Sequence, residues 1–157
     1  MKVLLLLCLA LVPVVPQKVK TGCVTLSHKN FGGYLTSGKK NNDKTRWVST
    51  KEEGKEQWEI TDVGGGLYTI MNKEFDEYLV ASRDTNWAKN YNVFLWIPGN
   101  EGMTGHKWKI TRQEQYSIIE VPQPKSCLMT GTDETVSAKP ASRCDVAPFF
   151  KWRIQSC

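Results

Sequence analysis

Short segments in which apolar and polar side chains alternate recur along this chain, and they recur in threes. In every copy an apolar anchor is followed nine residues later by a leucine. The three pairs of anchors are Leu26 with Leu35, Ile70 with Leu79, and Ile119 with Leu128. Alternation over short runs that are rich in Val, Ile, Thr and Tyr predicts half-buried β-strands rather than helices.

A tryptophan placed two residues before an isoleucine closes each copy. The pairs are Trp58 with Ile60, Trp108 with Ile110, and Trp152 with Ile154. The leucines and the tryptophans both indicate a repeat of roughly 44–50 residues, within the range of known repeat architectures. Because the three tryptophans recur at one position per repeat, we expect them in the core.

The segments between the anchors are clusters of turn-forming residues. Glycine, proline and asparagine gather at 29–33, 64–66, 98–100 and 122–124, and no long helical period with caps is present. Three copies of a four-strand unit fit a closed barrel capped by hairpins, which leaves no exposed sheet edge. The sequence therefore predicts an all-β fold, a β-trefoil of twelve strands.

The N-terminal segment is typical of a secretory signal peptide. Lys2 precedes an almost wholly apolar run from Val3 to Val15, which is too short to span a bilayer and ends at the polar Gln17. We assign residues 1–17 to the signal peptide, with its cleavage site left open, and residues 18–157 to one β-trefoil domain. The mature protein is then expected to be secreted, extracellular and without membrane insertion.

Four cysteines remain once Cys8 leaves with the signal peptide. They are Cys23, Cys127, Cys144 and Cys157, an even number in an exported chain, which predicts two disulfides. Three pairings are possible, and the spacing does not choose among them. A zinc site is the alternative, but no two of these cysteines form a C-x₂₋₄-C pair.

Positive charge is concentrated at the start of the mature chain. The whole chain has 21 basic and 16 acidic side chains, yet between Lys18 and Lys51 the only acid is Asp43. Within that region Lys39, Lys40, Lys44 and Arg46 are candidates for binding an anionic partner such as a sulfated glycan. The alternative is a solvated face without a partner.

Catalytic motifs are absent from the sequence. It has no H-E-x-x-H, no G-x-S-x-G and no phosphate-binding glycine loop. His28 and His106 are expected to be surface or half-buried fillers, and the acidic run 52–56 to be a solvated loop. We therefore expect no enzyme activity, no catalytic residue, no metal site and no cofactor.

The remaining tryptophans differ from the three in the repeat. Trp96 is expected either to pack inward or to lie on a strand whose alternate residues do. Trp87 stands in a polar loop, and Asn86, Trp87, Tyr91 and Asn92 together are a possible sugar site, because an aromatic ring covers the apolar face of a sugar while amides bind its hydroxyls. The alternative is that Trp87 tucks over the barrel mouth.

The motifs Q-W-E-I at 57–60, G-L-Y-T-I-M-N at 66–72 and Y-L-V at 78–80 resemble a unit of the ricin-type β-trefoil, the ricin B-like lectin family. The resemblance covers nearly the whole mature chain and implies the same fold. It also implies a bridge from Cys127 to Cys144, and, because the first and last strands of a trefoil are neighbours, one from Cys23 to Cys157. The glutamine that the family places two residues before its tryptophan is absent in all three repeats, which argues against simple galactose binding.

The leader, the length and the divergent lectin repeat also resemble the salivary effectors of blood-feeding flies. That resemblance implies a secreted, non-enzymatic binding protein that acts on host vasculature, haemostasis or immunity through a protein receptor or an anionic, glycosaminoglycan-like partner. A ricin B-type lectin is the first alternative. A protease inhibitor that presents the loop from Lys39 to Arg46 is the second. We expect a monomer, and no nucleic acid partner.

Overall fold

The computed structural model describes residues 17–100 and 102–157. The strands are β1 (Gly22–His28), β2 (Tyr34–Lys40), β3 (Thr45–Lys51), β4 (Trp58–Gly64), β5 (Leu67–Asn72), β6 (Glu77–Thr85), β7 (Tyr91–Trp96), β8 (Trp108–Gln113), β9 (Tyr116–Val121), β10 (Ser126–Thr130), β11 (Val136–Pro140) and β12 (Trp152–Ser156), with one 3-10 turn, η1 (Pro148–Phe150). The predicted signal peptide over residues 1–17 lies, apart from Gln17, outside the described residues.

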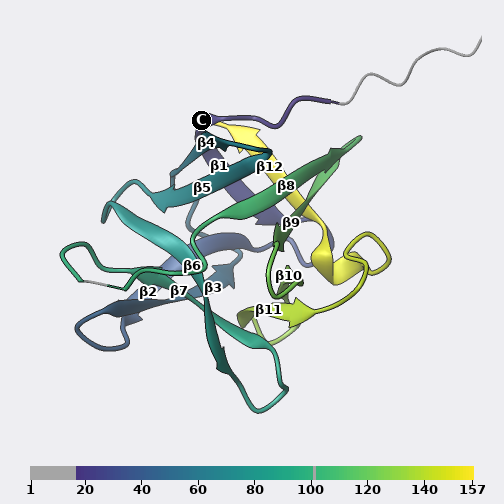
Figure 1. The fold of residues 1–157 in the computed structure, drawn as a ribbon. Helices are drawn as coiled ribbons and strands as arrows, with labels where there is room; N and C mark the ends of the chain where they lie inside the picture. Colours follow the sequence, from purple (N-terminus) through teal and green to yellow (C-terminus); the bar gives the residue numbers. More distant parts are fainter. Residues whose placement is uncertain (1–16, 101) are drawn as a thin grey trace, which may run out of the picture.

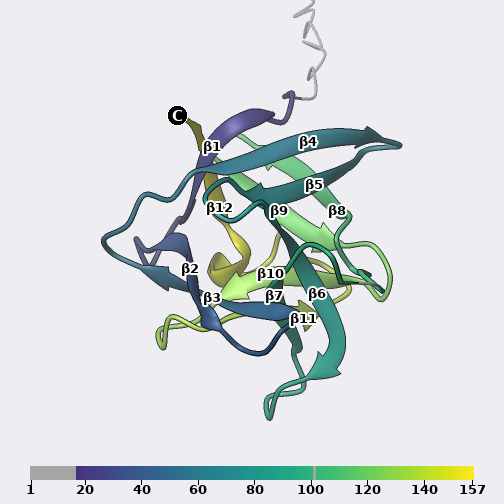
Figure 2. The same ribbon diagram turned by 90° about the vertical axis from the view of Figure 1, so that its left-hand side faces the viewer.

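Six of the strands pair into a closed ring. Its order is β1–β4–β5–β8–β9–β12 and back to β1, with every pairing antiparallel. Figures 1 and 2 show β1, β4 and β5 at the top of the molecule, near the C-terminus. Closure gives each of these strands two neighbours, so the ring has no open edge. The predicted all-β class and the closed barrel are confirmed.

The other six strands form three hairpins below the ring (Figure 1). They are β2–β3, β6–β7 and β10–β11. The hairpins also pair with one another, since β7 contacts both β3 and β11. A single bridge between Ser49 and Thr135 joins the first hairpin to the third. The hairpins therefore brace each other across the lower end of the barrel.

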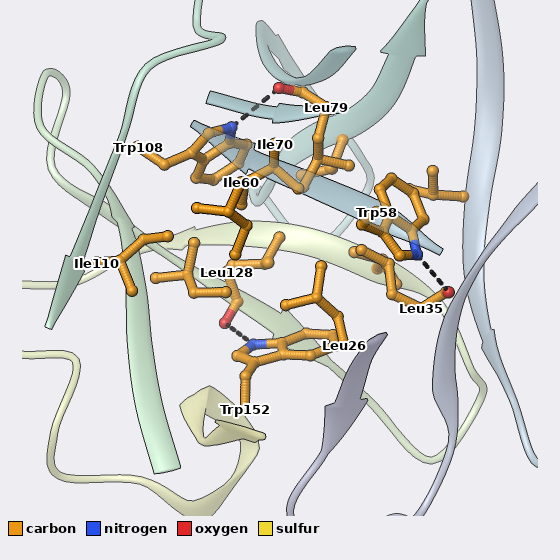
Figure 3. Close-up of a cluster of buried hydrophobic side chains, with 14 of the residues drawn as sticks. Leu26, Leu35, Trp58, Ile60, Ile70, Leu79, Trp108, Ile110, Leu128 and Trp152 are labelled. Carbon is orange, nitrogen blue, oxygen red and sulfur yellow. Dashed lines mark hydrogen bonds between the residues drawn. The ribbon is translucent and has the colours of Figure 1, made fainter. Parts of the chain in front are cut away.

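The three recurring tryptophans are completely buried at the centre of the molecule, as the sequence predicts. Each indole Nε1–H donates a hydrogen bond to a leucine carbonyl in the preceding hairpin (Figure 3). The bonds run from Trp58 to Leu35 at 3.2 Å, from Trp108 to Leu79 at 2.9 Å, and from Trp152 to Leu128 at 2.9 Å. The two sets of anchors seen in the sequence are thus direct partners in the core.

Two disulfides join the pairs of cysteines that the ricin-type resemblance implies. Cys23 is bonded to Cys157 across 134 residues, and Cys127 to Cys144 across 17. The first closes the ring at the β1–β12 pairing, where the Cys157 N–H also donates to the Cys23 carbonyl. In the chain-entropy account, loops of these lengths contribute about 5 and about 3 kcal/mol to stability.

His28 is fully buried, so the sequence expectation of a surface or half-buried side chain is wrong. Its ring stacks on Phe31 and meets the edge of Trp152. Its Nδ1 accepts hydrogen bonds from the backbone N–H groups two and three residues ahead, at 3.3 and 3.1 Å. Asn72 lies opposite Trp58 as His28 lies opposite Trp152, and its Oδ1 accepts the same two bonds. The imidazole of His28 therefore performs the turn-closing role of an asparagine.

Replacing Trp108 with alanine should lower the free energy of unfolding by about 3–5 kcal/mol, because the change empties a core site and leaves the Leu79 carbonyl without its donor. Trp87→Ala is the matched control, since that side chain is 95% exposed, and it should cost less than about 0.5 kcal/mol. Urea unfolding of both variants measures the difference. Equal losses would contradict the core assignment.

The stability of the protein should fall in acid through His28. Burial lowers the pKa of this imidazole below its ordinary value of 6.5. Below that pH the unfolded chain binds a proton that the folded chain does not yet bind, so the free energy of unfolding decreases until the pH passes the folded pKa. The stabilisation is fully present above about pH 6.5.

His28→Asn isolates this contribution, because asparagine keeps the acceptor that Asn72 uses and does not titrate. The loss of stability between about pH 7.5 and about pH 5 should be smaller in the variant than in the parent. His106, whose pKa is also lowered by burial, is present in both proteins and cancels in the comparison. An unchanged pH dependence would mean that His28 is not the titrating group.

Candidate functional site

Strand β7 presents two different faces because its side chains alternate. Val93 and Leu95 point into the core and are buried, whereas Asn92, Phe94 and Trp96 lie on the outer face and are half-buried. The second of the two expectations for Trp96 is therefore the right one. Its indole Nε1–H donates to the Asn100 carbonyl at 3.2 Å, which fixes the ring at the strand end.

The aromatic pair on β7 is not repeated in the other hairpins. Hairpin register makes Thr50, Leu95 and Ala138 equivalent, since each lies opposite the buried leucine of its hairpin. Phe94 and Trp96 flank Leu95, but a serine and a lysine flank the other two positions. These are Ser49 and Lys51 in β3, and Ser137 and Lys139 in β11. The threefold core therefore does not require aromatic side chains here.

Phe94 and Trp96 line a groove of about 430 Å³ between the β2–β3 loop and the β6–β7 hairpin. Asn92 lies in the same groove, which we call the β7 groove. Its charged lining residues, among those that the structure describes, are two cations, Lys44 and Arg83, and one carboxylate, Asp84. The ring of Trp47 packs against Phe94 at 4.8 Å between centroids and is 40% exposed.

The loop that carries Lys44 is held by short hydrogen bonds. The Asn42 Oδ1 accepts from the backbone N–H of Lys44 at 2.8 Å and from that of Thr45 at 2.9 Å. The Lys44 carbonyl in turn accepts from the Ile97 N–H, just beyond β7, at 2.9 Å. The backbone is thus fixed against the strand while the lysine side chain is exposed. Aromatic walls, an amide and paired cations suit a ligand with an apolar face and a negatively charged group.

The four residues of the predicted sugar site do not meet at one place. The Asn86 Oδ1 accepts from the N–H groups of Ala88 and Asn90, so it closes the hairpin loop. Trp87 stands 95% exposed at the tip, so the alternative that it tucks over the barrel mouth is wrong. Tyr91 packs against the core, and Asn92 alone enters the β7 groove.

The four residues of the predicted anionic-partner site differ in their exposure to solvent. Lys39, Lys40 and Lys44 are exposed, but Arg46 is not. Its Nε and Nη2 donate to both carboxylate oxygens of Glu77 at 2.8 and 3.1 Å, and its guanidinium lies 3.8 Å from the Phe75 ring centroid. The placement of Arg46 in an exposed docking group is therefore wrong, because its charge is already paired inside the molecule.

The acidic run at 52–56 contains one carboxylate that ties strands together. Glu52 and Glu53 are exposed, as a solvated loop predicts. Glu56 instead accepts hydrogen bonds from the Ser37 N–H and hydroxyl at 2.8 and 2.9 Å, and from the Asn72 amide at 2.8 Å. Among residues 17–100 and 102–157, no three His, Cys, Asp or Glu side chains gather as a metal site would need. No helix in that part of the chain is long and apolar enough to cross a membrane.

Comparison with solved structures finds proteins similar to this chain, whereas comparison with family models and curated sequences does not. No protein-family model and no curated protein sequence matches the chain. Two solved salivary proteins from Culex quinquefasciatus, of the Cysteine and Tryptophan-Rich (CWRC) family, are similar to it. One has 29% identity and a TM-score of 0.79, covering 92% of this chain and 100% of its own. The other has 27% identity and a TM-score of 0.76, covering 89% and 96%.

Proteins of other kinds share the fold at lower identity. The designed threefold-symmetric protein ThreeFoil matches at 16% identity and a TM-score of 0.71, over 87% of this chain and 99% of its own. A Polyporus squamosus lectin matches at 14% and 0.65, over 89% and 50%, and a Coprinopsis cinerea proteinase inhibitor at 13% and 0.70, over 89% and 100%. Identities this low show the fold alone.

Removing Arg46 should destabilise the fold far more than removing a neighbouring lysine. Arg46→Ala leaves the Glu77 carboxylate, 4% exposed, without its partner, and breaking a buried pair in this way costs about 3–5 kcal/mol. Lys40→Ala is the control, because Lys40 is exposed and lies across from Arg46 in the β2–β3 pairing. Urea unfolding should show less than about 0.5 kcal/mol for the control. Equal effects would place Arg46 on the surface.

Proposed function

We propose that this chain is a secreted, non-enzymatic binding protein of the salivary-effector kind, built on a divergent ricin-type β-trefoil. It acts on host vasculature, haemostasis or immunity by engaging an extracellular partner in the β7 groove. The two Culex salivary proteins support the effector proposal, since their likeness extends over nearly the whole chain at 27–29% identity. The two disulfides support an extracellular site of action, because such bonds persist in oxidising surroundings.

The observation that carries the binding proposal is the aromatic pair Phe94 and Trp96. The equivalent positions in the other two hairpins are serine and lysine, so the packing of the threefold core does not explain the pair. Its groove, at about 430 Å³, is within the size range of ligand sites. Among the described residues that line it, two cations, Lys44 and Arg83, outnumber one carboxylate, Asp84. These features favour a partner that inserts an apolar group beside an acidic one.

A non-enzymatic role is supported by how the candidate catalytic groups are used. Glu56, in the acidic run, accepts hydrogen bonds from three donors that connect β2 to β5. The Nδ1 of His28 is occupied by two backbone amides inside the core. Groups with these partners hold the fold and are not free to transfer protons.

Carbohydrate binding is the second candidate function. Asn92 places an amide beside the rings of Phe94 and Trp96 in one groove, the combination that sugars require. The protease-inhibitor alternative has less support, because Arg46, a basic residue that such a loop would present, is already paired with Glu77. A glycan array distinguishes carbohydrate binding from the effector function proposed above. Selective retention of a neutral sugar would favour the lectin.

The effector proposal is tested with the purified secreted protein in assays of platelet aggregation, plasma clotting, vessel contraction and complement lysis. At micromolar concentration it should change at least one of these. The double variant Lys44→Ser/Phe94→Ser should lose that effect by at least about tenfold, as expected when a central aromatic contact of an interface is removed. Trp87→Ser, which removes an exposed ring outside the groove, is the control and should keep it. A parent protein that is inert in all four assays, or a groove variant as active as the parent, would contradict the proposal.

A further inference from the structure

A second hollow lies beside β12 and the C-terminus, whereas the β7 groove belongs to the hairpin end. Figures 1 and 2 show the C-terminus at the top of the molecule and the β6–β7 hairpin at the bottom. The hollow has a volume of about 230 Å³ and is lined by Lys20, Arg112, Arg153 and Tyr116. Among the described residues that line it, Glu114 is the one carboxylate.

Two further cations meet at the tyrosine of this hollow. The ammonium of Lys29 lies 4.6 Å from the centroid of the Tyr116 ring, and that of Lys151 lies 4.7 Å from it. A backbone hydrogen bond from the Lys29 N–H to the Lys151 carbonyl, 2.8 Å long, holds the two lysines together. We call the three cations that line the hollow and the two lysines at its tyrosine the Tyr116 basic surface: Lys20, Arg112, Arg153, Lys29 and Lys151.

The positive charge of this surface is unbalanced, as a comparison of two equivalent strand pairings in the barrel shows. At the β4–β5 pairing, the residue after the buried Trp58 is Glu59, and it forms an ion pair with Lys73 at 4.0 Å. At the β1–β12 pairing, the residue after Trp152 is Arg153, and the position of Lys73 is taken by Lys29. One geometry therefore holds opposite charges in the first case and two positive charges in the second.

No ion pair compensates these cations within the part of the chain that the structure describes. The ion pairs there involve Arg46, Lys73, Lys125 and Arg143, and none of the five. Arg112 donates one bond, to the Lys18 carbonyl at 3.4 Å, which leaves most of its guanidinium donors free. Like charges held close together repel one another, and an anionic ligand would remove that cost.

We propose that the Tyr116 basic surface binds the sulfate groups of an extracellular polysaccharide. Lys151 and Arg153 flank the buried Trp152 in extended backbone, so they lie on the same outer face at a spacing of about 6.6 Å. The backbone hydrogen bond holds Lys29 beside Lys151, and Lys20 and Arg112 line the hollow together with Arg153. Several separate cations match a chain with repeated anionic groups better than one phosphate.

The remaining side chains of the hollow suit a polysaccharide rather than a membrane. Gln115, Tyr116 and Gln155 offer amide and hydroxyl groups for sugar hydroxyls. The half-buried Ile154 is the one aliphatic side chain among the described lining residues, so no apolar group projects for insertion into lipid. The inference relies on the extracellular location in the proposed function, but not on the β7 groove.

The experiment compares two triple variants with the same loss of charge. The first is Lys20→Ser/Arg112→Ser/Arg153→Ser, and the control is Lys39→Ser/Lys40→Ser/Lys44→Ser, the exposed lysines of the β2–β3 region. In heparin binding by surface plasmon resonance at physiological salt, the first should weaken the affinity at least about tenfold and the control less than about twofold. The slope of log Kd against log salt should fall by about 2–3 in the first variant, as counterion release from a polyanion predicts. Desulfated heparin should not bind the parent.

Each other result decides against the proposal. Equal losses in both variants would show attraction by net charge alone, and binding to phosphatidylserine vesicles in preference to heparin would identify a membrane site. If the triple variant lowers the melting temperature, the double variant Lys20→Ser/Arg153→Ser replaces it, because it leaves the Arg112 bond to Lys18 in place. The groove variant Lys44→Ser/Phe94→Ser should keep its heparin affinity, so failure here is distinguishable from failure of the effector proposal.

Discussion

The hydrogen bond from a buried indole to a leucine carbonyl, made three times, is the contact on which the arrangement of this molecule depends. Each tryptophan begins a ring strand (β4, β8 or β12), and each leucine lies in a hairpin strand (β2, β6 or β10). Every bond therefore fixes one hairpin to the ring. An unsatisfied buried carbonyl costs about 1–3 kcal/mol, and the indole ring adds the largest apolar surface of any side chain. Together they determine where each hairpin can lie.

Residues outside these bonds are free to differ among the repeats, and both proposed sites arise from such differences. Phe94 and Trp96 stand where the other hairpins have serine and lysine, and Arg153 stands where the first repeat has Glu59. In each case the backbone register is kept while the outward side chain changes. A departure from the repeat on an outer face is therefore a stronger sign of binding than a residue that recurs.

The core of this fold could be predicted from the sequence because its signal is periodic. Leu79 and Trp108 recur at fixed spacing, and burial on one face of a strand follows from alternation. The pairing of Arg46 with Glu77 could not be predicted, because the two residues are 31 positions apart and neither belongs to the repeating pattern. The Tyr116 basic surface could not be predicted for the same reason, because its cations are far apart in the sequence, from Lys20 to Arg153. The position of Trp87 stayed open between two alternatives, because composition alone does not say whether a loop aromatic has a surface to cover.

Stability of the closed barrel explains how unbalanced surfaces can persist. An exposed like-charge contact costs a fraction of a kcal/mol, comparable in size to an exposed ion pair of opposite sign. The Cys23–Cys157 bridge, across 134 residues, contributes about 5 kcal/mol in the chain-entropy account. That bridge lies at the β1–β12 pairing, which also carries Arg153 and ends next to Lys29. The disulfide and the unbalanced cations thus lie on the same pair of strands, so these strands stay paired whether or not an anion is bound. A surface held in this way is preorganised. An anionic partner does not have to order it, so the free energy of the electrostatic attraction is not spent on ordering and contributes to affinity.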